Sequence, residues 1–100
     1  MRLIARSALV HFYTTHPQGA AAREPLNAWY DEARRATWAT PADVKAQYRN
    51  ASVLKSGRVV FNIAGNKFRL VVAIHYNRGV VFVRFVGTHA EYDAIDANTF

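Results

Sequence analysis

Alternation of apolar and polar residues over residues 58–93 constrains the fold of this chain more than any other feature. The segment reads RVVFNIAGNKFRLVVAIHYNRGVVFVRFVGTHAEYD, with turn residues at Gly65-Asn66 and Asn77-Arg78-Gly79. A period of two residues is typical of strands that bury one face, and Gly and Asn tolerate the positive φ of tight hairpins. We therefore predict three antiparallel strands joined by two hairpins.

The register of these strands follows from their side chains, because a slip of one residue turns every side chain to the other face. A turn at Gly65-Asn66 creates one apolar face from the pairs Val59 with Val72, Phe61 with Leu70, and Ile63 with Phe68. A two- or four-residue second loop extends this face with Ile74, Val81, Val83 and Phe85. The opposite face then carries Arg58, Asn62, Lys67, Arg69, His75 and Arg84. A three-residue loop would bury Arg84 among valines, and we exclude it because an unpaired buried guanidinium is costly.

The first 57 residues are expected to supply the covering layer. Residues 1–4 predict a short edge strand, and Ser7 is a candidate N-cap for a helix that stops before Pro17. A second helix starts between Gln18 and Pro25, and its apolar face repeats at helical spacing through Leu26, Trp29, Tyr30 and Ala33. Thr40, Pro41 and Asp43 indicate the start of a short helix ending near Tyr48, followed by a polar connector over residues 50–57. His11 and His16 are interpreted as helix-surface or boundary residues.

These elements predict an α+β fold in one domain, residues 1–100. A small, mostly antiparallel sheet carries helices on one face and ends in a short helical turn, and the basic face is left uncovered. The 100 residues are 51% hydrophobic, enough for one core. The sequence contains no cysteine, which excludes disulfides and thiolate zinc sites. No apolar run is long enough to span a bilayer, so we expect no membrane association and a cytoplasmic location.

Positive charge without acidic residues is concentrated between Asp43 and Glu91. The net charge is +6, and no acidic residue occurs between Asp43 and Glu91. The cations inside this gap are Lys45, Arg49, Lys55, Arg58, Lys67, Arg69, Arg78 and Arg84. Such a distribution indicates a polyanionic partner.

The segment GTHAEYD closes the last predicted strand. Thr88 with Glu91 three residues later forms a capping-box pattern, which accounts for both residues structurally. His89, Tyr92 and Asp93 then lie on roughly the same side of one helical turn. A histidine, a tyrosine and an acid beside a cationic face suit metal-free cleavage of a phosphodiester, which needs a base, a proton donor and cations.

The segments FNIAGNKFRLVVAIHYNRGVVFVRFVGTHAEYDAID and AWYDEARRATWATPADVKAQY closely resemble the HigB toxins, relatives of RelE in bacterial toxin-antitoxin pairs. The resemblance implies an mRNA interferase, an endoribonuclease that cleaves messages, commonly on the translating ribosome in related toxins. It also implies a cognate HigA-like helix-turn-helix antitoxin as partner, with DNA bound only through that antitoxin, and no cofactor.

Within the matching motifs we expect Arg69 and Arg84 to hold the scissile phosphate and His89 to donate or accept a proton. Tyr92 would position a base or assist proton transfer, and Asp93 would either orient His89 or favour the helix start. The cations expected to guide RNA are Arg58, Lys67, Lys55 and Lys45. Asn66 is interpreted as a turn residue.

This interpretation requires Arg69 and Arg84 to lie next to each other on neighbouring strands, open to water and within reach of His89. Two alternatives remain. The chain could be a nucleic-acid-binding module without chemistry, or a protein-interaction domain whose basic surface docks an acidic partner.

Overall fold

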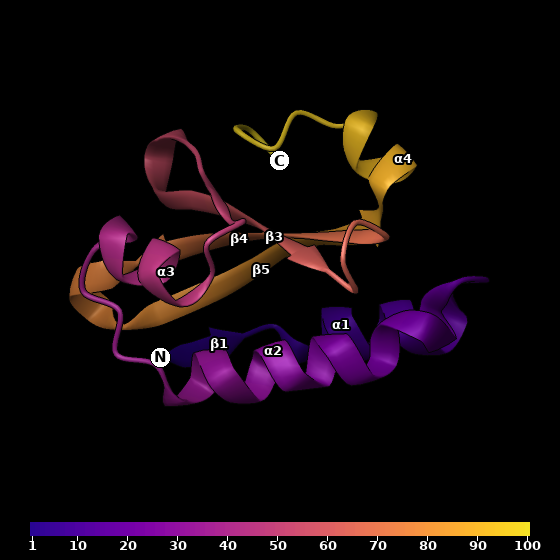
Figure 1. The fold of residues 1–100 in the computed structure, drawn as a ribbon, viewed down its shortest axis with the longest axis horizontal. Coiled ribbons are helices and arrows are strands. Elements are labelled where there is room, and N and C mark those ends of the chain that lie inside the picture. Colours follow the sequence, from indigo (N-terminus) through magenta and orange to yellow (C-terminus); the bar gives the residue numbers. More distant parts are fainter.

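The computed structural model, which describes residues 1–100, is a five-stranded sheet with helices on one face and the C-terminal segment on the other (Figure 1). The strands are β1 (Arg2–Ile4), β2 (Ser52–Val53), β3 (Arg58–Ile63), β4 (Phe68–His75) and β5 (Val80–Thr88). The α-helices are α1 (Arg6–Thr15), α2 (Arg23–Arg35), α3 (Pro41–Gln47) and α4 (His89–Asp93). None of them combines the length and apolar content needed to cross a membrane. The predicted α+β architecture is confirmed.

The strand order is β1-β5-β4-β3-β2, with β1 parallel to β5 and the other neighbours antiparallel. The predicted pairs of Val59 with Val72, Phe61 with Leu70, and Ile63 with Phe68 are all present. The second loop is a four-residue connection between His75 and Val80, with Gly79 in the left-handed region at φ 66°. The first turn differs in detail, since the positive φ values fall on Ala64 and Gly65 rather than on Asn66.

Helices α1 and α2 bury the apolar residues that the periodicity selects. Leu9 and Phe12 of α1 and Leu26, Trp29 and Ala33 of α2 are buried against the sheet. The rings of Trp29 and Phe61 are 5.3 Å apart, which places α2 directly on β3. These contacts make the main core.

The start of α1 differs from the prediction, whereas the starts of α2 and α3 agree with it. Ala5, not Ser7, occupies the N-cap of α1, because the chain enters this helix directly from β1. A 3-10 turn, Gly19–Ala22, precedes α2. Helix α3 begins at Pro41 with Thr40 as its N-cap, as expected, and Asp43 completes a capping box with Thr40. The connector over residues 50–57 contains the two-residue strand β2, which the polar composition concealed.

Strand β5 contains a bulge at Arg84 that the sequence did not predict. Val83 pairs with Val72 and Phe85 pairs with Val71, so Arg84 has no partner on β4. The extra residue reverses the alternation beyond it. Val86 therefore joins the main core, while Phe85, expected there, lies on the opposite face.

The face opposite α1 and α2 is partly covered, so the prediction of an open basic face is wrong. Val60, Val71 and Ala97 form a second buried cluster, and Leu54, Phe85 and Tyr92 pack around it. Phe100 lies edge-on to Phe85, with ring centroids 5.3 Å apart. Figure 1 shows α4 and the C-terminal segment crossing this side of the sheet. Apolar residues interspersed among the cations of β3 to β5 provide the surface on which this segment packs.

Candidate functional site

Helix α4 begins immediately after β5 because Thr88 caps it. The Glu91 N–H donates to Thr88 Oγ1 at 3.2 Å, and the Thr88 N–H donates to Glu91 Oε1 at 2.8 Å. This reciprocal pair is the predicted capping box. It holds a helix of only five residues at the end of the strand.

The start of α4 is also tied to the turn between β3 and β4. The His89 N–H donates to the carbonyl oxygen of Lys67 at 3.1 Å. This bond joins the two sequence motifs, GNKFR and THAEYD, which are separated by some twenty residues. A histidine and a lysine-bearing turn therefore meet at one end of the sheet.

The His89 imidazole is oriented by Asp93, one of the two roles expected for that carboxylate. His89 Nδ1 lies 3.0 Å from Asp93 Oδ2, and the two side chains are 50% and 60% exposed. A carboxylate at Nδ1 favours the tautomer with its proton there and leaves Nε2 as the lone-pair nitrogen. Nε2 makes no hydrogen bond within the chain, so it is free to exchange a proton with a ligand.

Arg69 lies on β4 but not in the environment that we expected. It is only 9% exposed, so the prediction that it is open to water is wrong. Its Nη1 donates to the carbonyl oxygens of Asn66 and Phe68, both at 3.2 Å, and Nη2 is 3.5 Å from Asn66 Oδ1. No acid neutralises this guanidinium. Asn66 is the predicted turn residue, and it also holds Arg69 in place.

Arg84 does not lie next to Arg69, because the cross-strand partner of Arg69 on β5 is Gly87. The bulge turns Arg84 to solvent at the edge of the sheet, where its guanidinium lies 5.6 Å from the centre of the Phe82 ring. The expected pair of adjacent arginines is therefore wrong. The physical reason is the bulge, which leaves Arg84 outside the ladder.

The remaining predicted residues are distributed around these groups. Tyr92 is half-buried against the second cluster, on the same side of the sheet as Arg69. Arg58 donates from Nη2 to the Phe100 carbonyl oxygen at 3.3 Å, and its Nε is buried without a partner. Lys55 and Lys67 are exposed. Lys45 Nζ instead donates to the carbonyl oxygens of Arg49 and Ala51, both at 2.8 Å, so it secures the end of α3.

Comparison with protein families agrees with this arrangement of motifs. Residues 22–95 match the family described as HigB toxin, RelE-like toxic component of a toxin-antitoxin system. The chain belongs to the HigB toxin family. The match includes α2 and every strand except β1, together with α4. Comparison with curated proteins finds no match.

Membership of the HigB family makes this chain the toxic component of a toxin-antitoxin pair and implies an antitoxin as partner. The HigB-family chain gathers no group of three or more His, Asp and Glu side chains that could hold a metal ion. Its site chemistry is that of an oriented imidazole, a half-buried phenol and a buried guanidinium at one end of the sheet.

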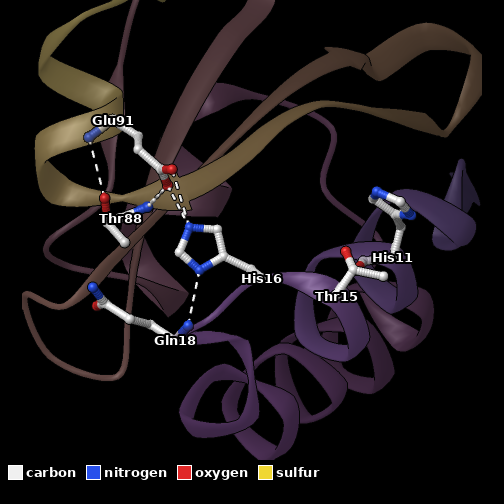
Figure 2. Close-up of polar contacts among 6 residues, drawn as sticks. All are labelled: His11, Thr15, His16, Gln18, Thr88 and Glu91. Atoms are coloured by element: carbon white, nitrogen blue, oxygen red, sulfur yellow. Dashed lines mark hydrogen bonds and ion pairs between the residues drawn. The ribbon is translucent and has the colours of Figure 1, made fainter.

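One feature of this HigB-family site was missed in the sequence. His16, interpreted as a boundary residue, places Nε2 3.0 Å from Glu91 Oε2, and its Nδ1 accepts the Gln18 N–H at 3.0 Å (Figure 2). The bond from the Thr88 backbone, followed by the His16 contact, holds the pKa of Glu91 below its ordinary value. Asn62 lies directly opposite Arg69 on β3 and is exposed. The register had placed Asn62 on that face, but the contact of His16 with Glu91 carried no sequence signal.

Proposed function

We propose that this toxin is a metal-independent endoribonuclease that cleaves mRNA, on the translating ribosome, by attack of a ribose 2′-hydroxyl. The observation that carries the proposal is the His89 and Asp93 pair, with Nδ1 and Oδ2 3.0 Å apart and Nε2 free beside the Lys67 turn. Histidine is the side chain best suited to exchange protons near neutral pH.

The reaction needs two proton transfers and one stabilised phosphorane. A base removes the 2′-hydroxyl proton, and the oxygen then attacks the adjacent phosphorus. The bond to the 5′-oxygen breaks, and that oxygen takes a proton from a donor. The products are a 2′,3′-cyclic phosphate and a 5′-hydroxyl. His89 Nε2 serves as one of these proton-transfer groups, and Tyr92, one turn along the same helix, positions or assists the other.

Cations at this end of the sheet stabilise the negative charge of the phosphorane, which is the remaining requirement of the reaction. A guanidinium that is already desolvated loses little on meeting a phosphate and can bind it through two parallel hydrogen bonds. Arg69, buried without an acid and held by neutral carbonyls, has this character. We propose that Lys67, Lys55 and Arg58 guide the RNA strand towards it. Lys45 is left out of this set because its Nζ donates to the carbonyl oxygens of Arg49 and Ala51.

In the cell we expect a HigA-like helix-turn-helix antitoxin to restrain the toxin in the cytoplasm. DNA would be contacted only through that antitoxin. The proposed reaction requires no cofactor.

The test is cleavage of a defined mRNA by purified protein, with ribosomes in magnesium buffer and, separately, without ribosomes in the presence of EDTA. His89→Gln should lower the cleavage rate by about 10²- to 10⁴-fold, the range for loss of an acid-base group. His75→Gln is the matched control, since His75 is an exposed histidine at the opposite end of β4. A message with 2′-deoxyribose at the cleaved position should resist cleavage.

Tight RNA binding by the wild-type protein without any cleaved message would instead favour the binding-module alternative. Equal cleavage by wild type and His89→Gln would remove His89 from the mechanism. If cleavage required a divalent cation even in the absence of ribosomes, the metal-independent reaction would be contradicted.

A further inference from the structure

An open groove of about 760 Å³ separates α1 from the bulged half of β5. It exists because β1 pairs with β5 only as far as Phe82, so the rest of β5 is a sheet edge facing α1. The groove is lined by His11, Thr15, His16, Arg84, Phe85 and Val86, among others. No role in the cleavage reaction falls to this groove.

One full positive charge, that of Arg84, lines the groove, and no acidic residue does. Arg84 makes no ion pair, and its stacking on Phe82 leaves the guanidinium edge available. His11 is exposed and its ring has no hydrogen-bond partner; Figure 2 shows it and Thr15 on one side of α1. Arg84 is the only residue of β5 that pairs with no residue of β4, and its side chain lines the groove.

The one nearby acid is already engaged. Glu91 accepts hydrogen bonds from the Thr88 N–H and contacts His16 Nε2 (Figure 2). His16 in turn uses Nδ1 to accept the Gln18 N–H, so both ring nitrogens are occupied. The carboxylate therefore does not pair with Arg84, and its oxygens are occupied by hydrogen bonds from Thr88 and His16.

We infer that this groove binds a second segment of the RNA strand, with Arg84 on a phosphate and His11 on the neighbouring ribose or base. The inference rests on the proposed function and extends it. An arginine and an imidazole in one groove are groups that bind the phosphates and bases of single strands. Arg84 thereby changes from a ligand of the scissile phosphate to a ligand of a neighbouring one.

The distance from Arg84 to the start of α4 allows one continuous RNA strand to contact both Arg84 and His89. Arg84 and Thr88 lie four residues apart on β5, roughly 13 Å at the rise of a strand. Thr88 adjoins His89, so an RNA that reaches the imidazole needs only a short extension along the edge of β5 to reach Arg84. An acidic peptide would meet the same charge, but nothing would place it in line with His89.

Equilibrium binding of a fluorescent single-stranded oligoribonucleotide, carried out in a His89→Gln background, tests the inference without cleavage. Adding Arg84→Gln should weaken binding about five- to tenfold at low salt. The slope of log affinity against log salt should fall by about 0.7, the loss of one phosphate contact on a single strand. His11→Gln should weaken binding less, and Arg78→Gln is the matched control because Arg78 is exposed in the loop at the other end of β5.

The same variants with His89 intact should raise KM for programmed ribosomes and leave kcat near the wild-type value. Unchanged affinity and KM in Arg84→Gln would overturn the inference, as would a fall in kcat alone, which would return Arg84 to the scissile phosphate. Weaker binding of the antitoxin with unchanged RNA binding would assign the groove to a protein partner. Failure of the proposed function looks different, since the His89→Gln parent would then bind no RNA or the wild type would cleave none.

Discussion

Replacement of Arg69 by methionine distinguishes a functional arginine from a structural one. Arg69 is 9% exposed and has no acidic partner, and its two shortest hydrogen bonds, both 3.2 Å, end on neutral carbonyl oxygens. Methionine keeps the length and volume of the side chain but removes the charge. We therefore compare the cost of burying the cation with the value of its bonds.

The two opposing contributions are similar in size. Each hydrogen bond from a charged donor is worth about 1.5–3 kcal/mol, and burying a cation costs several kcal/mol. Asn66 is exposed, so water can reach its carbonyl oxygen once the guanidinium is gone. We expect Arg69→Met to be neutral or to raise the free energy of unfolding by about 1 kcal/mol, a rise in Tm of about 4–8 °C.

Activity should respond in the opposite direction. If the guanidinium meets the reacting phosphate, cleavage by Arg69→Met should fall by about 10²-fold or more. Urea denaturation and the mRNA cleavage assay on the same preparation measure both quantities, and Arg78→Met serves as the exposed control, with stability expected within about 0.5 kcal/mol of wild type. A loss of more than about 2 kcal/mol in Arg69→Met would refute the argument and make Arg69 a structural residue. A stable and fully active variant would remove it from the reaction.

Three further substitutions test other contacts. Gly87→Ala should destabilise the protein by about 1–3 kcal/mol in thermal denaturation, because the added Cβ would lie 2.6 Å from Cζ of Phe85; Phe85→Leu should recover part of this loss in the double variant. Glu91→Gln keeps the capping geometry but removes the charge, so at neutral pH it should cost less than about 1 kcal/mol in urea denaturation. The pKa of Glu91 is lowered in the folded state, so its charge stabilises the fold above the ordinary value of 4.5, and the difference between wild type and Glu91→Gln should shrink as pH falls below it. Asp93→Asn should lower kcat for cleavage about tenfold with little change in KM, since it loosens the orientation of His89.

Each of these has a distinct contrary result. An unaffected Tm in Gly87→Ala would mean that the aromatic ring is not held against the strand. A stability difference for Glu91→Gln that grows in acid would reverse the sign of the linkage. Full activity in Asp93→Asn would leave the carboxylate with the helix start as its only role.

The sequence predicted the strand pairing well because alternation reports which face of a strand is buried. The pairs of Val59 with Val72 and Ile63 with Phe68 needed only that pattern and a turn of the right length. The N-cap at Thr40 and the capping box at Thr88 were equally accessible, since the bonds of a cap join residues three apart. The alternation of apolar residues and the capping bonds between residues close in sequence therefore predicted most of the fold.

Features that depend on contacts between distant segments were not predictable in the same way. The burial of Arg69 depends on the cover over its face, and that cover uses Ala97 and Phe100, which belong to no periodic pattern. The bulge at Arg84 depends on Phe85 finding a place in the second cluster rather than in the main core. A local motif predicted the site residues His89, Tyr92 and Asp93. Only the fold shows that Arg84 and His11 line the same groove.

The bulge at Arg84 has a consequence for how this strand tolerates change in length. Substituting the residue there leaves the count of residues intact, and Val86 and Phe85 still reach their opposite sides of the sheet. Deleting it would leave Val83, Phe85 and Val86 consecutive opposite Val72, Val71 and Leu70, so the ladder would become regular and each side chain would keep its face. The faces of this strand therefore depend on neither the identity nor the presence of the bulged residue, and Arg84 is left free to serve a ligand.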